Sequence, residues 1–276
     1  MRRYLALLAV TFGFGATLAQ PANALEIAVS PARFELSIDN KRKTQTLEIV
    51  NSADREVEIG IDLANFDLDE NNQLRVLPPT EQSLDQWIAI NPTRVKIPAR
   101  GRRTMRFAIR PQVEPEAGEH RAVIFLNEDK TSTTADGLSF KFRLGVVVYG
   151  QVGEANRAAT LHAVSSDQRG LTLDVQNTGN AHARFKGLYA VWDASSYPGD
   201  AAAQALLQNI EDTRKPSEDV VAPGTLAAGI MAQTPVLPGA RRVIVQQLPD
   251  TAKHGQRKVF LLGKLGDAPV SASYGL

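Results

Sequence analysis

Alternation of apolar residues with a period of two is the feature of this chain that most restricts its fold. Between Leu138 and Val148 every second residue is apolar, in the stretch "LSFKFRLGVVV". A period of two places those side chains on one face of an extended strand. The alternation continues over residues 138–148, whereas a typical strand has only about 5–6 residues. We therefore expect an unusually long strand with one apolar face over residues 138–148.

Shorter segments of the same kind occupy most of the remaining chain. They include "EIAVSPARFELSI", which Pro31 interrupts, "TQTLEIVNS", "VEIGIDLANFDL", a short strand in "WIAIN" that starts at Trp87, "TMRFAI", "LTLDVQN" and "RRVIVQQL". Turn residues separate them about every 8–12 positions, which is typical of an antiparallel β-sandwich. We therefore predict an all-β fold of two β-sandwich domains in tandem. One short helix is expected in the second domain, in "DAAAQALLQNIED" with Asp200 as its N-cap.

The N-terminus has the layout of a secretory signal peptide. Arg2 and Arg3 precede an apolar run that ends near Leu18, and Ala22 and Ala24 occupy the −3 and −1 positions of an A-x-A cleavage site. The alternative, a membrane anchor, needs about 20 apolar residues, and this run is shorter and ends in a cleavage site. We predict a signal peptide over residues 1–24, a first domain over 25–152 and a second domain over 153–276, so that the mature chain starts near Leu25.

Composition restricts the partners of the mature chain. Removing Arg2 and Arg3 from the 31 basic residues leaves 29, which face 30 acidic residues. A net charge near −1 gives no general attraction to nucleic acid or to an anionic membrane surface. The chain has no cysteine, so neither disulfides nor a lipidated cysteine is expected. No later segment is long and apolar enough to span a bilayer, so we predict no membrane insertion.

Motifs for enzyme chemistry are missing from the sequence. The four histidines, at 120, 162, 182 and 254, are scattered, and we expect each to be an ordinary surface or strand histidine. No HExxH, GxSxG, P-loop or GxGxxG pattern occurs. The stretch "DLDENN" begins like a calcium loop but lacks its glycine and has Pro78 at the place of its final glutamate. We predict that the protein is not an enzyme and binds no cofactor or metal.

The order of these elements resembles that of periplasmic pilus-assembly chaperones of the PapD type. "VSPARFEL", "LEIVN" and "WIAINPTRVKIPARGRRTMRFAI", together with the alternating strand, resemble the first domain of that family. "QNTGNAHARF" and "PVLPGARRVIV" resemble the second, so that the resemblance covers essentially the whole mature chain. It implies two immunoglobulin-like β-sandwich domains in tandem. It also implies a periplasmic protein that holds pilus or fimbria-like subunits before their assembly at the cell surface.

The resemblance also implies how such a subunit is bound. One long chaperone strand completes the subunit's open sheet, which is donor-strand complementation. On this chain the donor strand would present Leu138, Phe140, Phe142, Leu144 and Val146 to the client. An arginine of the family grips the client's terminal carboxylate, and Arg33 in "SPARFEL" matches it. An outer-membrane usher and self-association are further partners that the resemblance allows.

The sequence departs from the family at two places. A lysine that belongs beside the anchoring arginine falls at Val146 or Val147, and the nearest cations, Lys141 and Arg143, lie earlier in the strand. The segment around residues 195–230 has no counterpart that we can assign. The alternative function is that of a non-catalytic β-sandwich module of the cell envelope, which uses the same fold for binding or structure without donating a strand.

Overall fold

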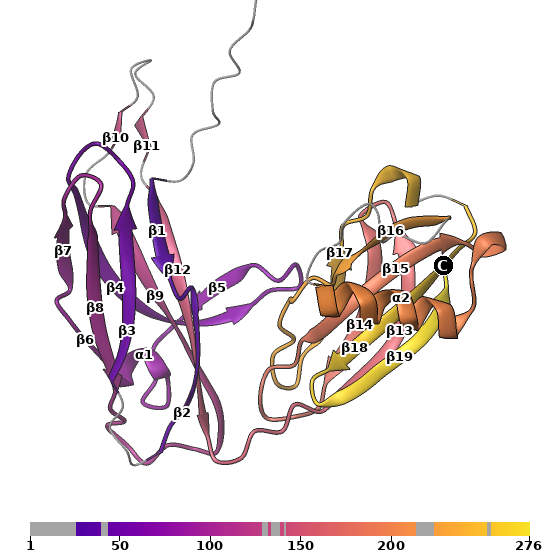
Figure 1. The fold of residues 1–276 in the computed structure, drawn as a ribbon. Coiled ribbons are helices and arrows are strands. Elements are labelled where there is room, and N and C mark those ends of the chain that lie inside the picture. Colours follow the sequence, from indigo (N-terminus) through magenta and orange to yellow (C-terminus); the bar gives the residue numbers. More distant parts are fainter. Residues whose placement is uncertain are drawn as a thin grey trace, which may run out of the picture.

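The computed structural model of the chain describes residues 26–39, 44–128, 132–133, 139–140, 142–213, 224–252 and 255–276. The predicted signal peptide lies outside these residues. Two β-sandwiches follow one another along the chain (Figure 1), and each sheet takes its strands from one half of the sequence. In the described part, no helix is long and apolar enough to cross a membrane.

The N-terminal sandwich packs two sheets against each other. One sheet has the order β1-β3-β8-β6 and the other the order β2-β12-β9-β4-β5, with β7 also paired to β4. Their strands are β1 (Ile27–Ser30), β2 (Arg33–Ser37), β3 (Thr44–Asn51), β4 (Val57–Leu68), β5 (Leu74–Leu77), β6 (Ile88–Asn91), β7 (Arg94–Ile97), β8 (Arg102–Ile109), β9 (Gly118–Glu128) and β12 (Arg143–Val152). A two-stranded hairpin of β10 (Ser132–Thr133) and β11 (Ser139–Phe140) precedes β12.

Pro31 divides the first alternating segment between the two sheets. β1 pairs with β3 in one sheet, whereas β2 pairs with β12 in the other. Proline has no N–H for a sheet ladder, so a strand is interrupted where it occurs. The predicted interruption at Pro31 is therefore confirmed, and it brings Arg33 next to β12.

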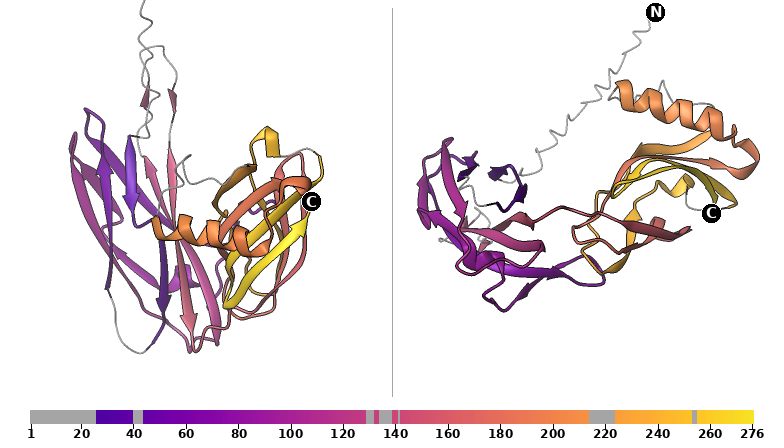
Figure 2. Two further views of the ribbon diagram at one scale, coloured as in Figure 1. Left: turned by 45° about the vertical axis from the view of Figure 1, so that its right-hand side comes forward. Right: turned by 90° about the horizontal axis from the view of Figure 1, so that it is seen from below.

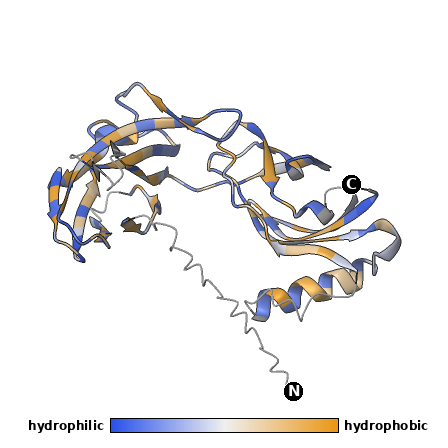
Figure 3. Ribbon diagram, turned by 90° about the horizontal axis from the view of Figure 1, so that it is seen from above, coloured by the Kyte–Doolittle hydropathy of each residue, from blue (hydrophilic) through white to orange (hydrophobic). Residues whose placement is uncertain are grey.

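Alternating residues of the two sheets fill the N-terminal core. Leu47, Ile49, Ile59 and Phe107 are almost fully buried there. Successive hydrophobic and hydrophilic bands along the strands show this alternation (Figure 3). One local expectation was wrong: Trp87 does not begin a strand but ends the short helix α1 (Leu84–Trp87), and its indole N–H donates to the Glu81 carbonyl at 2.9 Å.

The C-terminal sandwich has the sheets β13-β14-β17 and β16-β15-β18-β19. Their strands are β13 (Ala159–Asp167), β14 (Gly170–Asn177), β15 (Phe185–Asp193), β16 (Thr225–Ile230), β17 (Arg241–Gln246), β18 (Arg257–Leu265) and β19 (Ala268–Gly275), with the 3-10 turns η1 (Ala194–Ser196) and η3 (Asp250–Ala252). The predicted all-β class with two sandwiches is confirmed. The exact domain boundaries stay a prediction, although β12 ends at Val152 and Gly153 follows with a φ of 74°, a conformation that favours glycine.

The predicted helix of the second domain is also confirmed. Helix α2 (Asp200–Thr213) lies on the outer face of the sheet that contains β15 and β18 (Figure 2). Leu207 and Ile210 of α2 pack against Trp192 of β15 and Phe260 of β18 in a separate apolar cluster. Asp200 lies in the first turn of the helix and not before it, so its N-cap assignment was wrong by one position.

Each sandwich uses one buried asparagine to fix a loop to its core. Asn51 donates from Nδ2 to the carbonyls of Arg55 and Pro98, at 2.8 and 2.9 Å. Asn177 donates from Nδ2 to the carbonyls of Ala181 and Val236, also at 2.9 and 2.8 Å. Buried backbone carbonyls need such donors, and Asn177 thereby fixes the loop that carries His182.

Replacing Asn177 by aspartate should therefore destabilise the C-terminal sandwich. Aspartate has no N–H to donate, and its carboxylate would face two carbonyl oxygens in a buried site. We expect the free energy of unfolding to fall by at least about 3 kcal/mol, measured by chemical denaturation. The exposed Asn71→Asp change is the control and should alter it by less than about 0.5 kcal/mol; equal effects of the two changes would contradict the role of Asn177.

Candidate functional site

One edge of β12 lacks a neighbour over its first residues. β12 pairs with β9 along its whole length, from Arg143 to Val152. On its other side β2 begins only at Arg33, which lies opposite Val147. Within the described residues, positions 143–146 of β12 therefore have a strand on one side only. Open strand edges of this kind can accept a further strand from another chain.

The backbone groups that face this open side can be identified. The N–H of Val147 donates to the Ala32 carbonyl at 3.2 Å, so Val147 directs its backbone groups toward β2. Successive residues of a strand direct these groups to alternate sides. Arg143 and Gly145 therefore present their N–H and C=O groups to the open side. We call residues 143–146 of β12 the open edge.

The predicted single strand over residues 138–148 is divided in the structure. Ser139 and Phe140 belong to β11, and β12 starts at Arg143 and continues to Val152. Leu138 lies outside the described residues, as does the side chain of Phe140. The alternation of apolar residues in the sequence continues without interruption from β11 into β12, so the sequence pattern does not reveal this break.

The described members of the apolar row differ in burial. Phe142 and Leu144 are half-buried and pack against the edge of the N-terminal core, whereas Val146 is fully buried within it. Val146 therefore has no surface to offer a partner, which corrects its place in the expected donor row. Phe142 and Leu144 keep part of their surface beside the open edge.

Arg33 lies where the open edge ends. It is the first residue of β2, and 41% of its side-chain surface is exposed. Its Nε lies 3.2 Å from Oε1 of Glu35, two residues further along the same strand. The anchoring arginine expected from the sequence is thus in register with β12 and accessible from the space between the two sandwiches.

The position opposite Arg33 holds no lysine. Val147 occupies it, and Arg143 stacks its guanidinium on the Phe125 ring at 3.5 Å instead of reaching toward Arg33. Lys141 lies outside the described residues. Besides Arg33, charges of the other sandwich act on the nearby Glu35, namely Arg184 just before β15 and Lys186 within it.

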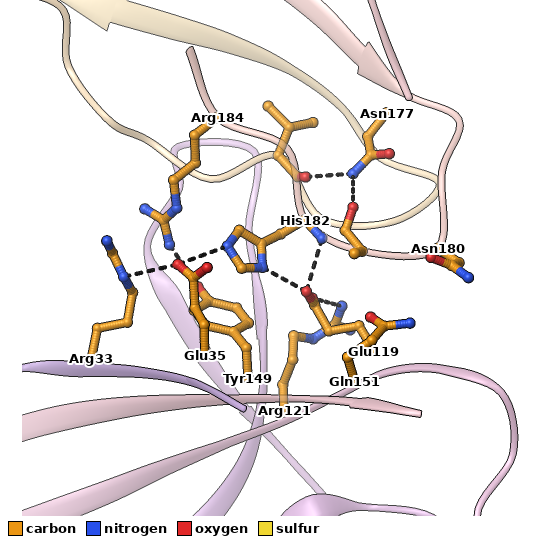
Figure 4. A network of polar contacts seen from close by, with 12 residues as sticks. Arg33, Glu35, Glu119, Arg121, Tyr149, Gln151, Asn177, Asn180, His182 and Arg184 are labelled. Atoms are coloured by element: carbon orange, nitrogen blue, oxygen red, sulfur yellow. Dashed lines mark hydrogen bonds and ion pairs between the residues drawn. The ribbon is translucent and has the colours of Figure 1, made fainter. Parts of the chain in front are cut away.

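His182 connects the two sandwiches at this place (Figure 4). Its ring lies 4.0 Å from the Tyr149 ring of β12, centroid to centroid. Its Nδ1 lies 2.5 Å from Oε2 of Glu119 in β9, and its backbone N–H donates to the same oxygen at 2.8 Å. Its Nε2 lies 3.4 Å from Oε1 of Glu35. A buried histidine of the second sandwich thus contacts two carboxylates of the first.

An apolar contact supports this polar one. Phe66, Val123 and Tyr149 lie on the outward face of the first sandwich's sheet, and Leu237 of the second packs against them. This explains why the run "AVIFL" of β9 is buried on both faces. Arg242 adds a hydrogen bond from its guanidinium to the Leu68 carbonyl at 3.0 Å.

Electrostatics at the junction favour a negative charge on Glu35. Partial burial alone would raise the pKa of this carboxyl, but His182, Arg33, Arg184 and Lys186 together hold the pKa below its usual value. Burial also lowers the pKa of Arg184 and raises that of Tyr149. The site is therefore suited to holding a carboxylate between cations of both sandwiches.

Catalytic or metal chemistry has little support in these residues. Among the described side chains, no group of three or more His, Cys, Asp or Glu residues could hold a metal ion. Asp69 of the "DLDENN" stretch accepts hydrogen bonds from the N–H groups of Asn71 and Gln73, so its carboxylate closes its own turn.

Several site residues were missed by the sequence analysis. His182, Glu119 and Arg184 were not singled out, and His182 was taken for an ordinary strand or surface histidine. A local signal exists, because "GEHRA" at the start of β9 and "NAHARF" in the loop before β15 place charged or titratable residues directly beside apolar strands. Which of these charges meet depends on how the two sandwiches pack, and no local pattern contains that information.

Comparisons with known proteins return structural matches only. No family model matches the chain, and the search of curated proteins found no match in sequence. The fold is similar to that of the YadV chaperone, with a TM-score of 0.47 and 13% identity over 91% of this chain and 100% of that one. The class 5 fimbriae chaperone CfaA gives a TM-score of 0.46 and 12% identity, over 90% and 98% of the two chains. The Pseudomonas aeruginosa CupB2 chaperone gives 0.44 and 10%, over 90% and 98%. At these values the likeness describes the overall fold.

Replacing His182 by alanine should loosen the junction. The Glu119 side chain is only 2% exposed, and without the imidazole it would be a buried carboxylate with too few partners, which costs about 3–5 kcal/mol. We expect a lower melting temperature and a larger radius of gyration by X-ray scattering. The double variant H182A/E119Q should recover part of the melting temperature, because it removes the unpaired charge. An unchanged scattering curve for H182A would contradict the linking role of His182.

Proposed function

We propose that this protein is a non-enzymatic periplasmic chaperone that binds exported pilus or fimbria-like subunits through the open edge of β12. The observation that carries the proposal is this edge, which leaves backbone groups of Arg143 and Gly145 facing an unfilled side of the sheet. An immature subunit with an incomplete sandwich likewise has a sheet edge whose backbone N–H and C=O groups are unpaired. Pairing the two edges satisfies both sets of backbone groups.

The side chains beside the edge fit such a partner. Leu144 is half-buried, and with Phe142 it continues the inward-facing row of β12 toward β11. Alternate apolar side chains of a donated strand fill successive pockets in the groove of the subunit. We include Phe140 and Leu138 in this row as a proposal, and we leave out Val146 because the chaperone's own core already buries it.

The position of Arg33 gives the bound strand a direction. A strand that lies along residues 143–146 and places its terminal carboxylate at Arg33 ends where β2 begins. Such a strand must run in the same direction as β12. Arg33 would bind this carboxylate through charge-assisted hydrogen bonds, for which a guanidinium is well suited. The chain end of the client thereby sets the register of the pair.

The proposed compartment and partners rest on the predicted signal peptide and on the resemblance to the chaperone family. The predicted signal peptide would export the chain, and we propose the periplasm as its destination, with cleavage near Ala24. An outer-membrane usher is the natural recipient of a chaperone–subunit pair. A second copy of the chain could cover the same edge in the absence of a client.

The second candidate is a cell-envelope β-sandwich module that donates no strand. It is favoured by the contacts of Phe142 and Leu144 with the protein's own core. If those contacts are all that these side chains make, the open edge is only the end of an ordinary sheet. The two functions differ in what a polar substitution at Leu144 would change.

A pair of variants separates the two functions. Leu144→Ser and Val146→Ser alter neighbouring positions on the same face of β12, but only Val146 is fully buried. Co-expression in the periplasm with a fibre subunit that lacks one sandwich strand gives the yield of complex. We expect L144S to reduce this yield at least tenfold with a small change in melting temperature. V146S should instead destabilise the fold by about 3–5 kcal/mol. A large loss of stability in L144S without any loss of complex would support the second candidate.

Arg33→Ala tests the anchor in the same assay. Arg33 is exposed and pairs only locally with Glu35, so its removal should leave the melting temperature nearly unchanged. A lost charge-assisted contact contributes about 1.5–3 kcal/mol, which corresponds to a roughly tenfold or greater loss of client affinity. Arg102→Ala, an exposed arginine of the opposite sheet, is the control. An unchanged client yield with R33A would remove Arg33 from the site.

A further inference from the structure

Basic side chains at the junction of the two sandwiches surround a carboxylate of the protein itself. Glu35 lies 3.2 Å from the Nε of Arg33 and 3.4 Å from the Nε2 of His182. Arg184 and Lys186 act on the same carboxylate from the second sandwich. Figure 4 shows Arg33, His182 and Arg184 directed toward Glu35 from both sides of the junction.

Arg184 is the unusual member of this group. It is only 6% exposed, which is rare for arginine unless it is fully paired. One terminal nitrogen donates to the Gln233 carbonyl at 2.6 Å, and the other lies 3.5 Å from the Tyr149 hydroxyl. Its Nε is buried without a hydrogen-bond acceptor. The contacts within the described residues therefore leave one donor of this buried guanidinium unsatisfied.

Glu35, by contrast, is held loosely. About 31% of its side chain is exposed, and its neighbour Arg33 is more exposed still. The second carboxylate, Glu119, is 2% exposed and is fixed by His182 and by Arg121, whose NH1 lies 3.7 Å from Glu119 Oε1. Of the two carboxylates, Glu35 is therefore the one that can leave its place without breaking the junction.

We propose that Glu35 is an internal stand-in for the client's terminal carboxylate, occupying a binding site that Arg33 and His182 form together with Arg184 of the second sandwich. This inference rests on the proposed function and adds to it a regulation of the anchor. In the free protein Glu35 neutralises the site. When a client strand lies along the open edge, its carboxylate replaces that of Glu35, which turns toward solvent.

The exchange makes the anchor selective. A client carboxylate must displace the carboxylate of Glu35, so weakly binding or badly placed anions have a low net affinity for the site. A strand that also pairs with residues 143–146 holds its carboxylate at the site at a high effective concentration. Arg184 takes the role that a lysine at position 147 would have had, but from the other sandwich. Client binding therefore requires both sandwiches in their observed arrangement.

A small carboxylate probe tests the stand-in without any client. The probe is acetyl-Ala-Ala with a free C-terminus, and its C-terminal carboxamide is the matched control ligand. Binding to the mature chain is followed by the side-chain Nε–Hε resonances of Arg33 and Arg184. We expect the Glu35→Gln variant to bind the free acid at least tenfold more tightly than the unmodified protein does. The carboxamide should shift neither resonance.

Further variants locate the site. E35Q/R184Q should lose the gain, whereas Glu48→Gln, which alters a half-buried glutamate of the opposite sheet paired with Arg102, should behave like the unmodified protein. If E35Q binds the acid no more tightly than the unmodified protein, Glu35 is not a stand-in. If E35Q and E35A both fail to fold, Glu35 is a structural partner of the junction and the inference is equally overturned.

The two proposals can fail separately. The peptide probe is too short to pair along the open edge, so its binding reports on the cation site alone. A negative result with E35Q, together with client capture that L144S abolishes, would remove the stand-in and leave the chaperone function. Tighter peptide binding by E35Q without any client capture would leave an anion site on a protein that donates no strand.

Discussion

Burial of the Glu119 carboxylate is the constraint on which the junction of the two sandwiches depends. A carboxylate that is 2% exposed is unfavourable unless it is paired, and its close partner, His182, belongs to the other sandwich. The same imidazole lies against Tyr149 and reaches Glu35. Together with the apolar contact of Leu237 and the hydrogen bond of Arg242, this buried contact holds Arg184 in place relative to Arg33, and with it the proposed anion site.

The open edge of β12 ends at Arg33, beside this junction. The edge arises because β2 starts late: the chain passes through Pro31 from one sheet to the other and reaches β12 only at Val147. Exposed edges favour unwanted pairing, and this one ends at a charged group, Arg33. In the proposed function, a client is admitted to the edge when its chain end satisfies that charge.

Most of the fold could be predicted from local patterns. The alternation in β3, β4, β8 and β14, the interruption at Pro31 and the helix near Asp200 all appear in the sequence, because each depends on neighbours within a few residues. The errors were local too. Trp87 was assigned to a strand because its bond to the Glu81 carbonyl depends on a turn that periodicity does not detect. The row from Leu138 to Val148 was taken as one strand because the alternation continues through the break between β11 and β12.

The sequence by itself determined the all-β class, the two sandwiches and the inward-facing residues, since side-chain period and turn chemistry are properties of short segments. It also indicated Arg33 through a resemblance. Only the tertiary structure decided that Val146 is core whereas Leu144 remains partly accessible, because burial depends on which strands lie alongside. Only the tertiary structure brought His182 and Arg184 to Glu35 and Glu119, more than 60 positions apart in the sequence. Charges that meet across two packed domains leave no periodic signal, because their contact is set by the packing of the whole surfaces and not by the chain between them.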